Sequence, residues 1–200
     1  MIRDKPAVPP SAVATANVNE QGYCEGFKSM WENKNFIRLA CSYAIIYGVY
    51  VAVGTSMSNT LNPFGYTPTD IAITGATCLL SGVVAALIIG CYLDCTGAYK
   101  KTHISLGSLT FLSAVALLLV LAFSKGSLAA IMIPVFLFGV SAVSFFPASL
   151  SYGAELTFPL QPALVNACMN FLGQISAFIM MGLASVITDV DASKMDEIVI

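Results

Sequence analysis

The chain has 200 residues, of which 57% are hydrophobic and 10% are charged, and its formal net charge at pH 7 is −2. Soluble domains carry about 25% charged residues, so this composition favours a protein that lies in a lipid bilayer. The net charge alone does not decide whether nucleic acid is a partner, but no basic stripe exists and no nucleic-acid partner is expected. The long segments are apolar throughout and do not alternate as barrel strands do, so the sequence predicts an all-α membrane protein.

The first 35 residues differ from the rest of the chain. Their first part is rich in Pro, Ala and polar side chains, which predicts a disordered or extended cytoplasmic segment. Residues 25–40 are compatible with a short interfacial helix on which Phe27, Met30 and Trp31 share one side. A plain cytosolic helix start explains them equally well. We assign residues 1–35 to a disordered or interfacial cytoplasmic segment.

Long runs without a charged residue follow, and each exceeds the roughly 20 residues that a helix needs to cross the bilayer core. Pro134 and Pro147 fall inside the fourth run and should bend its helix or free backbone carbonyls. A five-helix bundle is predicted over residues 36–188, followed by an acidic, non-cytoplasmic tail over residues 189–200. The five predicted spans are residues 38–58, 71–93, 103–124, 128–152 and 163–187.

Basic residues are concentrated on one side of these spans. The side opposite the N-terminus carries only Lys125 and Lys194. The positive-inside rule therefore places the N-terminus in the cytoplasm. We expect an integral, multi-pass protein of the plasma membrane, with the mitochondrial and endoplasmic reticulum membranes as alternatives. The basic residues on the N-terminal side are Arg3, Lys5, Lys28, Lys34, Arg38, Lys100 and Lys101.

Three tyrosines follow a helical spacing in the first span. Tyr43, Tyr47 and Tyr50 stand at positions i, i+4 and i+7 and therefore share one helix face. Tyrosine faces attract small cations through their ring quadrupoles. Packing, or a place in the interfacial aromatic belt, is the alternative for Tyr43. Gly48 and Gly54 should allow another helix to approach closely.

Three amides follow a similar spacing in the fifth span. Asn166, Asn170 and Gln174 stand at i, i+4 and i+8, and amides that face lipid would leave unpaired polar groups. They should face the bundle interior or a water-filled path. Interhelical hydrogen bonding alone is the alternative for Asn166 and Asn170. Tyrosine faces and amides together suit a small cation with few hydrogen-bonding groups.

An enzyme is not expected. No span carries a carboxylate at its middle, and the sole histidine, His103, lies at a helix start, so no nucleophile, base and orienting group can be assembled. The six cysteines have no zinc-ligand spacing and are interpreted as structural thiols. We therefore predict no catalytic residue, no metal site and no cofactor.

The loop between the second and third spans has a distinctive pattern, Gly90-x-x-x-Asp94-x-x-Gly97-x-x-Lys100-Lys101. It resembles the loop motif of major facilitator superfamily transporters, although the position after Asp94 lacks the usual basic residue. Gly90 should permit close helix packing, Asp94 should accept from a facing helix N-terminus, and Gly97 should permit the reversal. We interpret the loop as a gating loop; an ordinary helix–loop–helix connection is the alternative.

Further segments resemble the C-terminal half of the feline leukaemia virus subgroup C receptor-related family. The resemblance implies a twelve-helix transporter of choline and ethanolamine, with haem export as an older family assignment. The family's substrate-side tyrosine matches Tyr50, with Tyr47 as an adjacent candidate, and its glutamine matches Gln174. The matching segments are RDKPAVPPSA (3–12), NKNF (33–36), YGVYVAVGTSMSNTL (47–61), GCYLDCTGAYKKT (90–102) and YGAELTFPLQPALVNACMNFLGQISAF (152–178).

The resemblance implies that the chain is a C-terminal-half fragment that works with an N-terminal transporter half. It would then move a small organic cation by alternating access, with Tyr47, Tyr50, Asn170 and Gln174 as substrate-binding residues. The lipid bilayer and choline, ethanolamine or haem would be its further partners. A haem transporter of the same family is one alternative. A non-transporting membrane subunit that packs against partner helices is the other.

Overall fold

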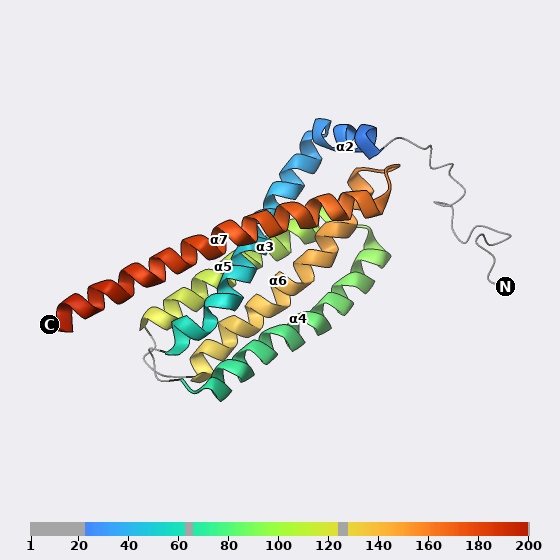
Figure 1. Ribbon diagram of the computed structural model, residues 1–200. Helices are drawn as coiled ribbons and strands as arrows, with labels where there is room; N and C mark the ends of the chain where they lie inside the picture. The colour runs from blue at the N-terminus through green and yellow to red at the C-terminus, as the bar shows by residue number, and fades with distance from the viewer. Residues whose placement is uncertain (1–22, 63–65, 124–127, 200) are drawn as a thin grey trace, which may run out of the picture.

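The computed structural model describes residues 23–62, 66–123 and 128–199, and Figure 1 shows their arrangement. Every element in these ranges is a helix, and five helices are long and apolar enough to cross a membrane. The predicted all-α membrane architecture is confirmed. The helices are α2 (Tyr23–Glu32), α3 (Lys34–Leu61), α4 (Pro68–Thr96), α5 (Tyr99–Phe123), α6 (Leu128–Leu156) and α7 (Pro162–Val199).

Local sequence explains where the helices begin. Asn33 lies between α2 and α3, and its side chain accepts hydrogen bonds from the backbone N–H groups of Asn35 (3.0 Å) and Phe36 (3.4 Å). Thr67 and Asp70 form a capping box at the start of α4, where each side chain accepts from the other residue's backbone N–H. Such caps satisfy the free donors of a first helical turn.

The apolar spans match the predicted ones within a few residues at most ends. Their mean hydropathy lies between 1.5 and 2.4. The last helix differs, because α7 continues to Val199 through the residues predicted as a tail. Residues 189–200 contain neither Gly nor Pro, so nothing in their sequence ends the helix. Most of the predicted N-terminal segment, residues 1–22, lies outside the described residues.

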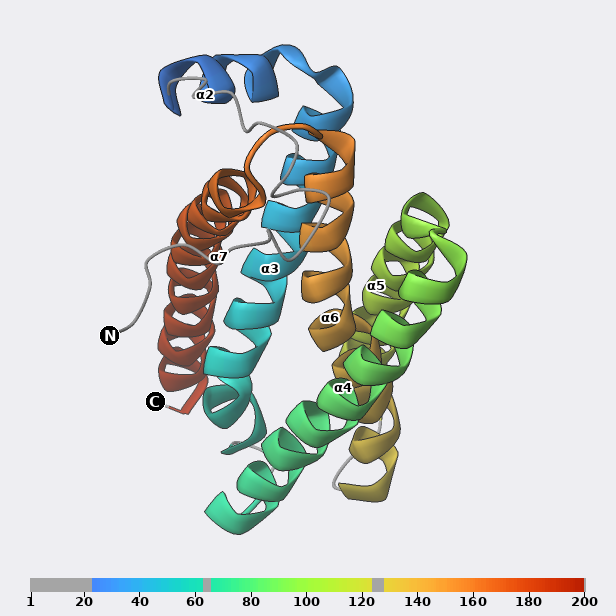
Figure 2. The same cartoon turned by 90° about the vertical axis from the view of Figure 1, so that its right-hand side faces the viewer.

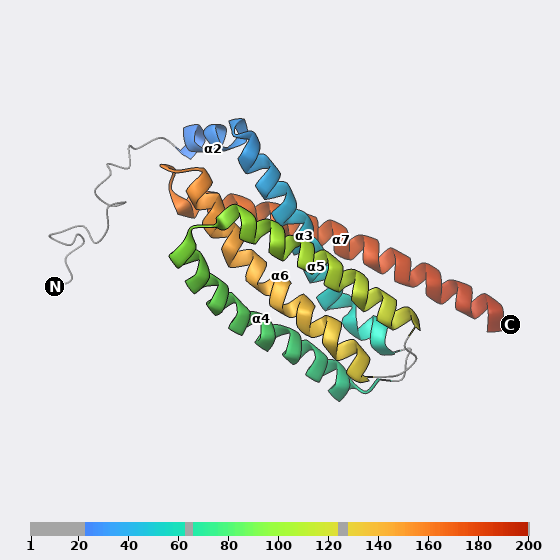
Figure 3. The same cartoon turned by 180° about the vertical axis from the view of Figure 1, so that it is seen from behind.

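The bundle is organised around α6. Half of its apolar span is buried, against at most 28% for the other four spans. α4 and α5 both pack along α6, and α3 packs along α7. Figures 2 and 3 show that α6 lies between α4 and α5, although these two are neighbours in sequence. Pro134 and Pro147 lie within one continuous α6.

Glycines permit the closest helix crossing, between α4 and α6. A Cβ atom on Gly82 would lie 2.6 Å from the carbonyl oxygen of Gly139. A Cβ on Gly139 would in turn overlap the backbone of Cys78. Membrane helices often pack closely through small residues, because the hydrophobic effect does not drive helices together within lipid.

Helix α2 lies across the end of the bundle (Figures 1 and 2). Met30 is fully buried, whereas Phe27 and Trp31 are exposed and their ring centroids lie 5.9 Å apart. The three residues therefore do not share one environment, because Met30 faces the core while the aromatic pair points outward. A Cβ on Gly26 would lie 3.2 Å from Leu164 of α7, which shows how closely α2 is seated.

Candidate functional site

The structure brings the predicted tyrosine and amide stripes together between α3 and α7. The Tyr43 hydroxyl donates to Asn170 Oδ1 at 2.8 Å, and Gln174 Nε2 donates to the Tyr47 hydroxyl at 2.7 Å. Both pairs are separated by 127 residues, so the two helices run in the same direction and in a constant register. The third amide, Asn166, lies one turn before Asn170 on the same helix.

Small residues let α3 and α7 approach closely at this point. A Cβ on Gly173 would lie 3.2 Å from the rings of Tyr43 and Tyr47. A Cβ on Gly48 would lie 2.6 Å from Ser176 Oγ. The close approach expected of Gly48 is therefore present, whereas Gly54 has no atom within 4 Å of such a Cβ. The tyrosine rings thus lie directly on the α7 backbone.

A phenylalanine from α6 completes the aromatic part of the site. Phe146 contacts all three tyrosine rings, with centroid distances of 6.0 Å to Tyr43, 5.2 Å to Tyr47 and 5.1 Å to Tyr50. Each contact is edge-to-face, an arrangement that aromatic quadrupoles favour. The Tyr50 ring also stacks on Phe138 at 6.1 Å. Tyr50 therefore belongs to the α3–α6 side of the site rather than to the amide stripe.

Phe138 and Phe146 were not predicted as site residues. The visible sequence feature was the Phe145–Phe146 pair directly before Pro147, inside a span. That pair alone does not indicate which ring faces α3, because the helix pairing decides it. Side-chain spacing could place the tyrosines on one face, but it could not select their partners on another helix.

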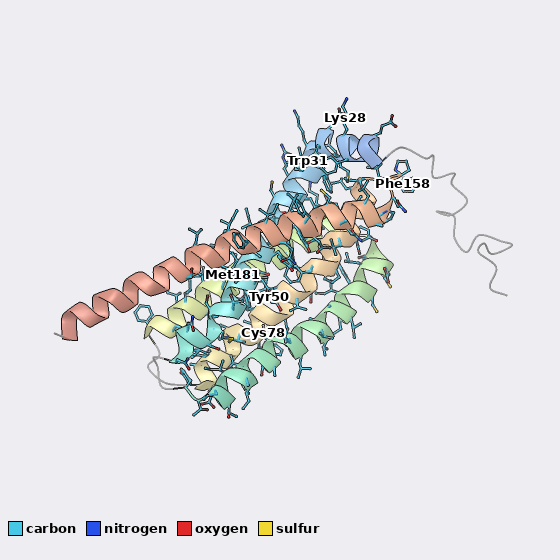
Figure 4. All side chains as sticks on the ribbon, viewed as in Figure 1. Lys28, Trp31, Tyr50, Cys78, Phe158 and Met181 are labelled. Atoms are coloured by element: carbon cyan, nitrogen blue, oxygen red, sulfur yellow. The ribbon has the colours of Figure 1, made fainter. Side chains whose placement is uncertain are left out.

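The site is open on its amide side. Tyr43 is buried and Tyr47 and Tyr50 are half-buried, whereas Asn170 and Gln174 are exposed. Asn166 Oδ1 is buried and accepts no hydrogen bond from the described residues. The exposed amides and these ring faces can contact a ligand that carries a positive charge and one hydroxyl group. Figure 4 shows Tyr50 midway along the bundle.

The predicted gating loop forms a short reversal between α4 and α5. Gly97 has φ 61°, and its N–H donates to the Leu93 carbonyl at 2.8 Å. This left-handed conformation favours glycine, as expected. The side chains of Asp94, Lys100 and Lys101 are exposed.

The expectations for Gly90 and Asp94 are not met within the described chain. A Cβ on Gly90 would have no atom within 4 Å, so no helix packs closely against it. Asp94 has no hydrogen-bond partner among the described residues, so its side chain accepts from no helix N-terminus there. Both residues border a small cavity of about 60 Å³ between α4, the start of α5 and α6.

His103 joins three helices in the described part of the chain. His103 is buried, with its Nε2 2.9 Å from Ser42 Oγ and its Nδ1 2.9 Å from Ser149 Oγ. His103 therefore links α5 to both α3 and α6. The sequence alone indicated only that it lies at the start of a helix. Within the described ranges, no three His, Cys, Asp or Glu side chains are arranged to hold a metal ion. The free cysteines there are Cys41, Cys78, Cys91, Cys95 and Cys168.

The chain is similar to several curated transporters. It is 26% identical over 180 residues to the choline/ethanolamine transporter flvcr2a of Danio rerio, covering 88% of this chain and 38% of that protein. It is 24% identical to the choline/ethanolamine transporter FLVCR1 of Felis catus, covering 86% of this chain and 31% of the relative. For FLVCR2 of Homo sapiens the identity is 23%, and the shares covered are 90% and 35%.

These similarities cover nearly the whole chain but only part of each relative. The chain spans about a third of the length of the curated relatives that it matches. No protein-family model matches it. The relatives' printed names agree with the family that the motifs resemble. The similarity to the feline leukaemia virus subgroup C receptor-related transporters that the sequence motifs predict is therefore confirmed across this chain.

Proposed function

We propose that this chain forms part of a transporter that moves choline, ethanolamine or a similar small organic cation across a membrane. The named relatives are choline/ethanolamine transporters, and this chain matches about a third of their length. The proposed mechanism is alternating access, in which this bundle and an N-terminal helical half rock around a shared substrate site. The bilayer is the plasma membrane in this proposal, with the N-terminus of the chain in the cytoplasm.

The Tyr47–Gln174 hydrogen bond is the observation that carries this proposal. It lies beside the Phe146 and Tyr50 rings, so an aromatic surface and an exposed amide occur within one site. A quaternary ammonium is attracted to aromatic faces. A single hydroxyl or amine on the same molecule can be recognised by the amides of Gln174 and Asn170. These groups match the two ends of choline and of ethanolamine.

The chemistry of the site also favours a cation over haem. The described part of the chain offers His103 only as a buried residue with both ring nitrogens engaged by serines. Haem iron is commonly held by an accessible His, Cys, Met or Tyr ligand. Tyr47 and Tyr50 are half-buried among other rings, and they present ring faces rather than a coordinated hydroxyl.

Uptake of radiolabelled choline and ethanolamine tests the proposal in cells that express the complete gene product. We expect Tyr50→Ala and Gln174→Ala each to reduce uptake at least tenfold, because the first removes an aromatic surface and the second an amide. A tenfold loss corresponds to about 1.4 kcal/mol of binding free energy. Tyr92→Ala and Gln161→Ala are matched controls. Both residues are exposed, and neither contacts the site.

The membrane abundance of each variant must equal that of the parent for the comparison to hold. Unchanged uptake in both site variants would contradict the proposed site and favour a role for the tyrosine–amide pairs in helix packing alone. No uptake of either substrate by the unmodified protein at normal abundance would contradict the proposed transport activity itself.

A further inference from the structure

A second site lies on a different face of α3 from the tyrosine–amide surface. It is a cavity of about 430 Å³ between α3, α5 and α6, at the end of the bundle where α3 and α5 begin and α6 ends. None of the tyrosine–amide residues lines it, although Phe145, which does, stacks on Tyr43. Its polar and charged lining residues are Asn35, Arg38, Ser42, Lys100, His103, Ser108 and Tyr152.

The charge in this cavity has one sign. Arg38 and Lys100 line it, and no carboxylate does. Neither side chain has an ion-pair partner within the described part of the chain. Lys100 also belongs to the first turn of α5, where unpaired backbone N–H groups and the helix dipole add positive potential. Basic pockets between helices on the cytoplasmic side are typical binding sites for the headgroups of anionic lipids.

Carboxylates at this end of the bundle lie outside the cavity. Glu32 ends α2, Asp94 lies near the end of α4, and Glu155 lies near the end of α6. None of the three lines the cavity, and all three side chains are exposed. The cations are therefore free to bind an anion that enters between α3 and α5.

Toward the middle of the bundle the cavity is lined mainly by apolar residues, with Ser108 as the polar exception. Arg38 and Ile46 both line it and are eight residues apart on α3, which corresponds to about 12 Å along a helix. Ile104 on α5 also lines the cavity, and its side chain is 57% exposed on the lipid-facing side of the helix. A soluble anion would gain nothing from this apolar wall, whereas an acyl chain would.

His103 forms a fixed part of the cavity wall. Ser42 donates to the Leu39 carbonyl at 2.8 Å and Ser149 donates to the Phe145 carbonyl at 2.7 Å, while both hydroxyls lie 2.9 Å from the imidazole. The ring is thus held from α3 and α6 together. Arg38 and Lys100, at the same end of the cavity, are the lining residues that can hold an anion there.

We propose that this cavity binds an anionic phospholipid, with its phosphate between Arg38 and Lys100 and an acyl chain along Ile46 and Ile104. Arginine can hold a phosphate through two parallel N–H bonds, and lysine adds a point charge. The lipid would connect α3 to α5, two helices that otherwise have few direct contacts. The site needs no part of the proposed transport cycle, so it stands apart from the proposed function.

Native mass spectrometry of the chain, released from nanodiscs of phosphatidylcholine with phosphatidylglycerol, tests this proposal. The two lipids share the phosphate, but only phosphatidylglycerol has a net negative charge. We expect Arg38→Ala and Lys100→Ala each to reduce retained phosphatidylglycerol about fivefold, and the double variant roughly 30-fold. The matched control is the double variant Lys28→Ala with Lys101→Ala. It removes the same charge from exposed positions that do not line the cavity.

Two further arms identify the source of the phosphate. Ile104→Asn makes the exposed wall polar and should reduce phosphatidylglycerol retention while both cations remain. Inorganic phosphate, added alone, should leave no retained adduct.

Equal lipid loss in the control double variant, or unchanged retention in the Arg38→Ala, Lys100→Ala variant, would overturn the proposal. A phosphate adduct that depends on both cations, without a lipid adduct, would overturn it in favour of a soluble phosphate ligand. Circular dichroism and size-exclusion chromatography verify that each variant is folded.

Discussion

One hydrogen bond joins Tyr47 of α3 to Gln174 of α7, and another joins Tyr43 to Asn170 one turn earlier. Gln174 nevertheless keeps an exposed amide. Its carbonyl oxygen has no hydrogen-bond partner among the described residues, so it can accept from a ligand without breaking the bond to Tyr47. The pair can therefore stabilise the helix contact and bind a ligand at once.

A double-mutant cycle between Tyr47→Phe and Gln174→Ala separates these two contributions. For folding, we expect a coupling energy of about 0.6 kcal/mol, because interhelical hydrogen bonds in membranes are weak. Chemical unfolding in detergent measures this coupling. For uptake by the complete protein, the proposed site predicts a loss larger than the change in stability explains, since both side chains would also contact substrate. An uptake loss that follows stability alone would assign the pair to packing. Tyr99→Phe with Gln161→Ala provides an uncoupled control.

At the scale of helices, glycine distinguishes the packed contacts from the open ones. Gly139 lies against the α4 backbone, whereas Gly75 and Gly90 of α4 face open space. The three residues look alike in the sequence, where each is a lone glycine in an apolar helix. Only the crossing of α4 with α6 tells them apart.

Gly139→Ala should therefore destabilise the bundle by about 1–3 kcal/mol, the usual cost of overpacking. The added methyl group would overlap the backbone of Cys78 unless α4 moves away. Gly75→Ala is the matched control, and it should leave stability unchanged or raise it slightly because alanine favours helix. Thermal unfolding in one detergent compares the two. Equal melting temperatures for both variants would mean that the α4–α6 crossing is looser than described.

Gly90→Ala distinguishes a fold role from a gating role for the loop motif. Because a Cβ there meets no atom within 4 Å, the variant should fold as stably as the parent.

The helices and their approximate limits could be predicted from charge-free runs and from turn residues such as Pro68 and Gly97. The partner of each helix face could not, since it depends on how distant segments pack. Phe146 was missed for that reason, and Gly90 was assigned a close contact that the described chain does not make.

At the scale of the whole molecule, the positive-inside rule predicts that the side with Arg38, Lys100 and Lys101 faces the cytoplasm. The end of α4 and the start of α5 lie on that side, and the end of α3 lies at the other end of the bundle (Figure 1). Basic loops remain in the cytoplasm because their translocation is unfavourable. The same orientation would place the proposed lipid site in the cytoplasmic leaflet, where anionic lipids are concentrated.

Cysteine labelling tests this orientation. In a variant that keeps only Cys95, which is exposed at the end of α4, a membrane-impermeant maleimide should react only after the cells are permeabilised. In a cysteine-free background, Asn62→Cys, at the exposed end of α3, should react in intact cells. The reverse pattern would invert the topology and place the N-terminus outside. A third variant that keeps only Cys168, which is buried, serves as an unreactive control in intact and in permeabilised cells.

The insertion of α6 between α4 and α5 has a consequence for biosynthesis. Gly82 leaves the ribosome 57 residues before Gly139, its contact on α6, an interval of roughly 3–11 s at usual synthesis rates. Asn170 and Gln174 are synthesised 127 residues after Tyr43 and Tyr47, their hydrogen-bond partners, which corresponds to roughly 6–25 s. During that time the α3 hydroxyls and the glycine face of α4 lack their final neighbours. A membrane-insertion factor that shields polar faces of nascent helices thus has a defined interval in which to act on this chain.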